Sequence, residues 1–331
     1  MNNKKMSSFL IDNILYICLF IMIVIIAIIS PSFVSTRVLS DVLIQSAPKV
    51  LLAMGMLVVI ISGGMDMTVG RLAGLGAVVA GTFAQTSDYY LKFWPNLAEM
   101  PLIVPFLVTV LVGAGSGVIT GLIISKFKVP AFLAGLGLQL VIYGGNLLFL
   151  KKAPNNSQPL AGYKVSFTNF GTGSIFGINY LVILAIAIMV IVFILLNRTT
   201  LGKNIYAVGG NREAAKVAGI NTFRVDMFVY IFSGVLAAMA GLMMSARTGS
   251  ATAAYAEGYE MDAIASCIIG GASFAGGIGN VPGTFLGVII FSVINYGLTF
   301  IGLSSYWQYI VKGLIIVIAV ALDMRKYAAR Q

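Results

Sequence analysis

Long apolar runs without a charged residue are the feature that most limits how this chain can fold. Residues 14–30 read ILYICLFIMIVIIAIIS, and runs of comparable length recur along the 331-residue chain. A helix of about 20 apolar residues crosses the ~30 Å hydrocarbon core of a bilayer and satisfies its own backbone hydrogen bonds there. The runs lack the strict alternation of polar and apolar residues that a transmembrane barrel requires. The predicted fold class is therefore an all-α polytopic membrane protein.

The apolar segments and the charges between them predict the topology. Lys and Arg accumulate in cytoplasmic loops and thereby set the orientation of a membrane protein. About ten spans place the basic residues at both chain ends, such as Lys4 and Arg325, on the same side as the most basic loop. We therefore predict about ten transmembrane helices with both termini cytoplasmic. The segments lie roughly at 14–30, 48–63, 70–85, 102–125, 131–150, 179–197, 225–246, 261–275, 283–302 and 306–322.

Charge and residue content exclude several classes of function. The formal net charge is +10, but 59% of the residues are hydrophobic, so the positive loops of a membrane protein explain the charge without a nucleic-acid partner. The sequence contains no histidine, and its two cysteines, Cys18 and Cys267, lie in apolar runs where we expect them to pack as small core residues. We therefore predict no metal site, no catalytic residue and no enzymatic activity for this chain. We expect membrane lipid to surround it.

Residues 1–331 are predicted to form a single membrane domain with two prominent connections. Residues 151–178 form a polar stretch rich in Gly, Asn and Ser, which we place on the periplasmic side as an ordered loop. Residues 198–224 form the longest charged loop, which we place on the cytoplasmic side. Neither connection is long enough to form a separate soluble domain.

The predicted cytoplasmic loop contains a short helix with recognisable ends. Asn211 is a favourable N-cap residue, Glu213 lies in the first turn, where the helix dipole stabilises an acid, and Gly219 suits the left-handed position after the last turn. A short basic helix flanked by glycines is shaped for docking onto another protein. The residues alone fit equally well an ordinary solvated connector with one turn of helix.

Three motifs resemble those of a known family, the ATP-binding-cassette sugar import permeases of the ribose/galactose branch. Residues 61–70, ISGGMDMTVG, are similar to the Gly-Gly-x-Asp-Leu-Ser-Val-Gly signature of that branch, with Met67 and Thr68 in place of Leu and Ser. Residues 270–277, GGASFAGG, also resemble this signature and echo the first copy, as internal repeats in transporters do. Glu213-Ala214-Ala215 followed by Gly219 resembles the Glu-Ala-Ala…Gly loop of import permeases.

The resemblance covers nearly all of the chain from about residue 30. Within the branch, three longer stretches are more similar to the galactose/methyl-galactoside permeases than to the ribose permeases. These stretches are residues 93–101 (FWPNLAEMP), 202–221 (GKNIYAVGGNREAAKVAGIN) and 292–323 (SVINYGLTFIGLSSYWQYIVKGLIIVIAVALD).

The resemblance implies a fold, a function and partners. It implies a type II ABC-importer-like fold that works as a homodimer, with a cytoplasmic ABC ATPase subunit below and a periplasmic sugar-binding protein above. This chain would bind no cofactor, and ATP and Mg would sit on the partner ATPase. In agreement, the sequence has no G-x-x-x-x-G-K-[ST] phosphate loop. The residues implied to couple to the ATPase are Asn211, Arg212, Glu213, Ala214, Ala215, Lys216 and Gly219.

Asp66 lies between two predicted spans and needs an explanation. A charge without a partner near the bilayer centre costs about 2.5–3.5 kcal/mol on insertion scales. Asp66 could fix a broken helix with Arg71 as its counter-charge, or it could contact a hydroxyl of the sugar that the resemblance implies. We favour a third interpretation over the sugar contact, in which Asp66 is a satisfied cap at the start of the third span.

Polar and aromatic residues within the spans are candidates for the lining of a solute pathway. Amides offer paired donors and acceptors and aromatic rings offer flat apolar faces, and both suit sugars. Taken singly, each residue fits an interhelical hydrogen bond or an interfacial aromatic belt as well. Together with Asp66, the candidates are Tyr143, Asn146, Asn295, Tyr296 and Trp307, with Gln308 beside the last.

Other functional classes stay open on residue chemistry. An ion-coupled secondary sugar transporter would normally use intramembrane acids or histidines as relays, but histidine is absent and only Asp66 and Asp262 are expected at depth. An intramembrane enzyme would need a nucleophile–base pair or a metal cluster, and a sequence without histidine and with scattered acids supplies neither. A passive channel gives no reason for a capped basic helix. Within the family, a permease for ribose or nucleosides is an alternative, because the resemblance implies that the binding protein largely decides the sugar.

Overall fold

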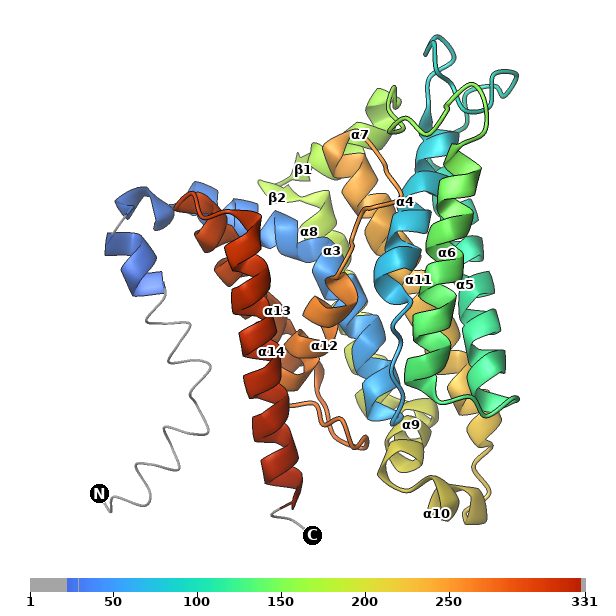
Figure 1. The fold of residues 1–331 in the computed structure, drawn as a ribbon, viewed down its shortest axis with the longest axis vertical. Coiled ribbons are helices and arrows are strands. Elements are labelled where there is room, and N and C mark those ends of the chain that lie inside the picture. The colour runs from blue at the N-terminus through green and yellow to red at the C-terminus, as the bar shows by residue number, and fades with distance from the viewer. Residues whose placement is uncertain (1–22, 29, 329–331) are drawn as a thin grey trace.

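The computed structural model describes residues 23–28 and 30–328, so most of the predicted first span, residues 14–30, lies outside the described residues. The described chain is a bundle of helices with one two-stranded sheet (Figure 1). In chain order the elements are η1 (Pro31–Phe33), α3 (Thr36–Ile61), α4 (Val69–Ala84), α5 (Ile103–Ser125), α6 (Ala131–Leu150), α7 (Val165–Thr172), β1 (Ser174–Ile175), β2 (Ile178–Asn179), α8 (Tyr180–Arg198), α9 (Thr200–Gly210), α10 (Arg212–Val217), α11 (Thr222–Thr248), α12 (Tyr259–Ile269), α13 (Val281–Phe300) and α14 (Ser305–Ala328).

Each predicted apolar segment from 48–63 onward contains one helix, but the extents differ. Within the described part of the chain, α3, α5, α6, α8, α11 and α13 are the six helices long and apolar enough to cross a membrane. The prediction of about ten spans thus stays a prediction. α3 begins at Thr36, well before the expected residue 48. Its first turns carry polar side chains that have protein partners, since Asp41 accepts a hydrogen bond from the Tyr296 hydroxyl at 3.2 Å, and hydropathy alone does not reveal such partners.

The predicted segment 261–275 is not one continuous helix. α12 contains 11 residues, about half the length that a spanning helix needs. The preceding stretch passes along α4, where a Cβ added to Gly74 would lie 2.9 Å from the Ala253 carbonyl oxygen. α12 therefore begins inside the bundle, and Glu260 in its first turn lies against Gly70 of α4.

The connections gather at two opposite ends of the bundle, which we name the α10 end and the α7 end (Figure 1). At the α10 end, the turns after α3 and α12 meet, and the Gly277 N–H donates to the Ile61 carbonyl at 2.9 Å. At the α7 end, Gln85 and Leu160 form isolated antiparallel bridges with Tyr163 and Ala251. Residues 151–178 and 198–224 thus lie at opposite ends, as their predicted placement on opposite sides requires. α14 ends at the α10 end (Figure 1).

The core of the protein is built around α3. Residues 50–61 are all buried, and 83% of its most apolar window is buried, compared with 22% for α6 and α8. α11, α12, α13 and α8 all pack against α3. A helix that is apolar on every face and enclosed by other helices is expected at the centre of a membrane bundle, whereas α6 and α8 present their apolar faces outward.

The two Gly-rich signatures fold into equivalent turns. Both helices end with the same three backbone hydrogen bonds and with a glycine in the left-handed region at the same place, namely Gly63 (φ +80°) and Gly271 (φ +88°). The echo in the sequence therefore has a structural basis at these turns. The bonds, donor first, are Ser62–Val58, Gly63–Ile60 and Gly64–Val59 after α3, and Gly270–Ser266, Gly271–Ile268 and Ala272–Cys267 after α12.

Glycines allow α11 to approach its neighbours at backbone distance. A Cβ added to Gly241 of α11 would lie 1.8 Å from the Ala73 carbonyl oxygen of α4, and one added to Gly234 would lie 2.4 Å from the Gly113 carbonyl oxygen of α5. Both contacts involve backbone atoms, which cannot move aside as a flexible side chain can. Small residues at such crossings are the usual means of packing helices in membranes.

We expect Gly241→Ala to destabilise the protein and Gly115→Ala, its matched control, to leave stability unchanged or slightly higher. An added methyl group at Gly241 forces α4 and α11 apart, and overpacking typically costs about 1–3 kcal/mol, whereas Gly115 has nothing within 4 Å of the new atom. The melting temperatures of the two variants are measured in detergent, with size-exclusion chromatography of heated samples as the readout of unfolding. Equal melting temperatures for the two variants would contradict this packing.

Candidate functional site

One asparagine shapes the charged segment at the α10 end. The Asn211 N–H donates to the Ala207 carbonyl at 3.0 Å and closes α9, while its side-chain oxygen accepts from the Ala214 N–H at 2.9 Å and caps α10. Gly219 follows α10 with φ +82°. The predicted short helix, its N-cap and its left-handed glycine are thus confirmed. Asn211 is therefore both the C-cap of α9 and the N-cap of α10.

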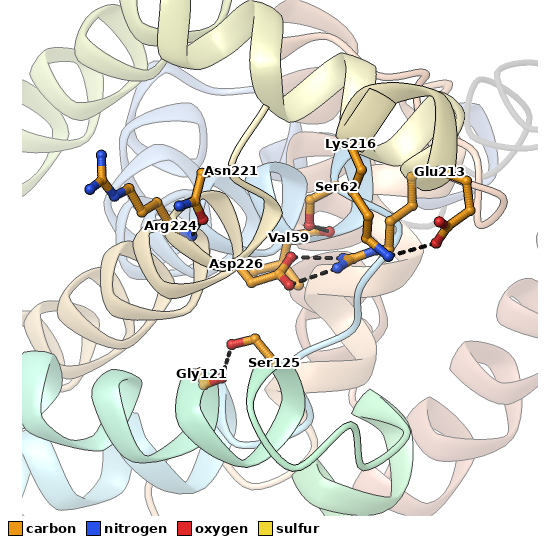
Figure 2. A network of polar contacts seen from close by, with 10 residues as sticks. Val59, Ser62, Gly121, Ser125, Glu213, Lys216, Asn221, Arg224 and Asp226 are labelled. Carbon is orange, nitrogen blue, oxygen red and sulfur yellow. Dashed lines mark hydrogen bonds and ion pairs between the residues drawn. The ribbon is translucent and has the colours of Figure 1, made fainter. Parts of the chain in front are cut away.

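A bidentate ion pair fastens α10 to the bundle. Arg212 donates from Nη1 to Asp226 Oδ2 and from Nη2 to Asp226 Oδ1, each at 2.8 Å, as the two dashed lines to Asp226 in Figure 2 show. The Asp226 side chain is only 4% exposed and sits in the first turns of α11. These hydrogen bonds raise the pKa of the Arg212 guanidinium, and two parallel charge-assisted bonds also fix its orientation.

Most side chains of α10 are exposed. Ala215 is buried against the core, while Glu213 and Lys216 are exposed and form an ion pair of 2.7 Å (Figure 2). The hydrogen bond from Lys216 lowers the pKa of the Glu213 carboxyl, so Glu213 stays ionised at neutral pH. Val217, at the end of the helix, is 90% exposed. The exposed side of α10 therefore combines charged groups with an exposed apolar side chain, a mixture typical of docking surfaces. It consists of Arg212, Glu213, Ala214, Lys216 and Val217.

A junction of glycines joins α9 to both Gly-rich signatures. A Cβ added to Gly209 would lie 1.7 Å from the Ile61 carbonyl oxygen and 2.7 Å from the Gly277 nitrogen, and one added to Gly276 would lie 2.9 Å from Gly63 Cα. The Tyr206 hydroxyl, one turn earlier in α9, donates to the Gly279 carbonyl at 2.7 Å. The signatures that carry the family resemblance thus meet beneath the charged segment, where only backbone fits.

Asp66 is buried, and both of its carboxylate oxygens accept hydrogen bonds. Its Oδ1 accepts from the Thr68 N–H at 3.0 Å and from the Thr68 hydroxyl at 2.6 Å, and its Oδ2 accepts from the Ser233 hydroxyl at 2.8 Å. The alternative in which Arg71 is the counter-charge of Asp66 is wrong, because Arg71 binds Glu257 at 2.8 Å instead. The favoured interpretation is correct in that the carboxylate is satisfied, but the N-cap of α4 is Thr68, and Asp66 ties this residue to Ser233 of α11.

The other predicted pathway residues fall into separate places. The Arg71 guanidinium stacks on the Tyr143 ring at 4.0 Å. Asn146 is 1% exposed on α6, and its amide has no hydrogen-bond partner among the described residues. Asn295 and Tyr296 line a cavity of about 420 Å³ between α3, α12, α13 and α14. Trp307 is not part of this lining and is 56% exposed, although the neighbouring Gln308 does line the cavity.

Two residues of these sites were not singled out from the sequence. Asp226 is an acid near the start of an otherwise apolar span and lies 14 residues after Arg212, and that isolated acid was the available signal. Lys49 lies 3.9 Å from Asp262 and Lys312 lies 3.0 Å from it. Lys312 lies within the last predicted span, and a lysine at that depth indicates that an acid is its partner. No local sequence pattern identifies Asp262 as this acid, or Lys49 as its second neighbour.

Comparison with known proteins identifies the family. Residues 38–320 match the family model described as branched-chain amino acid transport system / permease component. The chain belongs to this permease family. It is 41% identical to the galactose/methyl galactoside import permease protein MglC of Escherichia coli (strain K12) over 335 residues, which cover 100% of this chain and 99% of the relative. The ribose import permease protein RbsC of Bacillus subtilis (strain 168) is 37% identical over 314 residues, 95% of this chain and 92% of the relative.

Membership of the permease family confirms two predictions. The chain is a transport component and not an enzyme, and it is a multi-pass inner-membrane protein. A further relative, MglC of Haemophilus influenzae, is 39% identical over 335 residues, 100% of this permease and 99% of the relative. No solved structure shows a significant match to the chain.

We expect Arg212→Ala to loosen α10 and Lys216→Ala, its control on the same helix, to leave it ordered. The first change leaves the buried Asp226 carboxylate without its partner, a loss of about 1–3 kcal/mol, whereas the Lys216–Glu213 pair is solvent-exposed and screened. Amide hydrogen exchange of residues 211–219 in the purified permease reports the opening of this helix. The assignment fails if both variants exchange at the wild-type rate.

Proposed function

We propose that this chain is the membrane-spanning permease subunit of an ATP-driven importer for galactose and methyl galactoside. The observation that carries the proposal is the 41% identity to the import permease MglC over the full length of this chain. In this role the permease receives sugar from a periplasmic binding protein and releases it to the cytoplasm by alternating access. The finer architecture we propose is a type II ABC-importer-like fold with about ten spans and both termini cytoplasmic.

The segment α9–α10 is, in this proposal, the contact with a cytoplasmic ABC ATPase. Asp226, which is buried, anchors the segment through Arg212, and Gly209 contacts the turns that follow α3 and α12, while the other side of α10 is exposed. A docking element needs both properties, since a partner must find an accessible surface and its movement must reach the bundle. The proposed coupling residues are therefore Asn211, Arg212, Glu213, Ala214, Ala215, Lys216 and Gly219.

The remaining partners follow from the same proposal. The sequence has no phosphate-binding loop of the P-loop type, so ATP and Mg would bind the partner ATPase and this chain would need no cofactor of its own. We propose a homodimer of the permease, which offers one α10 surface to each of two ATPase domains. Among the pathway candidates, the cavity favours Tyr296 as a residue that meets solute.

An ion-coupled secondary transporter is less well supported. Three of the buried acids that could relay protons already have protein partners: Asp66 with Thr68 and Ser233, Asp226 with Arg212, and Asp262 with Lys312. Glu260 of α12 is the exception, because its buried Oε2 has no hydrogen-bond partner among the described residues. Ribose import is the closer alternative, since RbsC is 37% identical to this chain.

Reconstitution of the permease with its ATPase and a galactose-binding protein tests the function. Labelled galactose should accumulate in proteoliposomes only when all three components and ATP are present. Omission of each component in turn is the control. Accumulation by the permease alone, driven by an ion gradient, would establish the secondary-transporter alternative, and uptake of ribose without galactose would change the assigned sugar.

We expect Val217→Asp to reduce ATP-dependent uptake at least about tenfold, because it places a desolvated charge in the proposed ATPase interface. Val165→Asp is the matched control, since Val165 is also a highly exposed valine but lies on α7 at the opposite end. Co-purification of the ATPase with each variant separates docking from folding. Uptake and co-purification at the wild-type level for Val217→Asp would remove α10 from the interface.

A further inference from the structure

The hairpin β1–β2 displays apolar side chains that the described residues do not cover. Its two strands pair antiparallel and contain two residues each. Ile175 is 46% exposed, Phe176 in the turn is 96% exposed, and Ile178 is 49% exposed. A two-stranded hairpin gains little stability from its own pairing, and exposed apolar side chains that lie together mark an interaction surface. The hairpin therefore needs a partner outside the described part of the chain.

The turn of the hairpin holds a phenylalanine in a conformation that favours other residues. Phe176 has φ +52° and Gly177 has φ +79°, the pair of positive values that is typical of a type I′ turn and that Asn-Gly adopts most readily. A bulky side chain in the left-handed region costs about 1–3 kcal/mol. Packing within the described residues does not offset this cost, because Phe176 is almost fully exposed. A surface outside the chain must therefore supply the compensating contact.

The helix after the hairpin fixes the depth of the hairpin in the bilayer. α8 begins at Tyr180, directly after β2, and its 19 residues rise about 28 Å at about 1.5 Å per residue. This length matches the hydrocarbon core of about 30 Å. Arg198 in the last turn of α8 marks the opposite surface of the bilayer, since a charged side chain avoids the core. The hairpin therefore lies at the boundary between lipid and water at the α7 end.

The hairpin also continues the outward apolar side of α8. Residues 165–197 contain no charged side chain, and Ile186, Val190 and Phe193 along α8 are between 42% and 51% exposed. Figure 1 shows β1 and β2 at the side of the bundle, below α7 and next to the start of α8. A lateral position faces the bilayer, whereas a soluble partner approaches from the end of the bundle. The lipid surface is therefore the partner that this geometry favours.

We propose that β1–β2 is an interfacial anchor that inserts Phe176, flanked by Ile175 and Ile178, into the lipid surface at the α7 end. Its partner is the boundary between headgroups and acyl chains, where aromatic rings are favoured. Since the hairpin carries no charge, insertion depends on apolar burial and not on anionic headgroups. The anchor fixes the depth at which α8 begins, and it is independent of the sugar that the permease carries.

Electron paramagnetic resonance on the full-length permease in nanodiscs tests the insertion. A nitroxide label is attached at Phe176→Cys in a background with Cys18→Ala and Cys267→Ala. Oxygen concentrates in lipid and a nickel chelate stays in water, so the oxygen-to-nickel collision ratio at residue 176 should be several-fold higher than at a labelled Tyr90→Cys. Tyr90 is the matched control, because it is 82% exposed and lies outside the hairpin. Addition of phosphatidylglycerol to phosphatidylcholine nanodiscs should leave the ratio unchanged.

A second label, at Ile183→Cys in the first turn of α8, tests whether the hairpin anchors this helix. Phe176→Asn removes the ring but suits a type I′ turn, so the hairpin should fold. The collision ratio at residue 183 should then fall, because the start of α8 moves toward water. Phe176→Trp keeps an aromatic ring and should keep the wild-type ratio. Val165→Asn, at an exposed position of α7 outside the hairpin, should also leave the ratio unchanged.

Three results at residue 176 would overturn the proposal. A ratio as low as that at Tyr90→Cys would place the hairpin in water. Rare collisions with both reagents would show that protein covers the hairpin, such as a second copy of the permease. Immobilisation of the label only after a galactose-binding protein is added would assign the hairpin to that partner. An unchanged ratio at residue 183 in Phe176→Asn would equally remove the anchoring role.

Discussion

The enclosure of α3 by other helices is the constraint on which the rest of the structure depends. Residues 50–61 are buried on every side, so this part of α3 offers only apolar or small side chains to the helices that pack against α3, namely α8, α11, α12 and α13. Helices in a membrane gain little from apolar contact alone, since lipid is equally apolar, and close packing must supply the association energy. The close backbone contacts of α11 with α4 and α5, at Gly241 and Gly234, supply such packing.

α3 also reaches both regions to which we assign a role. Near its middle, Lys49 faces the cavity and Asp262. At its end, the Ile61 carbonyl accepts from Gly277 and lies against Gly209, directly beneath α10. A displacement of α9 is therefore passed to a helix that cannot bend into free space, because its neighbours surround it. Two packed arrangements of the helices around α3 would be the physical form of alternating access.

Local features were predictable from the sequence, whereas long-range pairs were not. Asn211 and Gly219 predicted the two ends of α10, because helix capping depends on residues within one turn of the helix end. The pairs Arg212–Asp226 and Lys49–Asp262 depend on the three-dimensional course of the chain, and no spacing rule supplies them. Arg71 shows the same limit: it is close to Asp66 in sequence, yet the turn after α3 directs the two side chains to different partners. The early start of α3 was missed because its polar residues are satisfied by later helices.

The late arrival of these partners affects how the protein is made. Ser233, which donates to Asp66, is synthesised 167 residues after it, and Lys49 waits for α12. During translation Lys49 and Asp66 therefore enter the membrane before Asp262 and Ser233 exist, and until then only Thr68 donates to Asp66. An ionisable group without a partner costs about 2.5–3.5 kcal/mol on insertion scales. The apolar length of α3 offsets this cost until α11 and α12 are made.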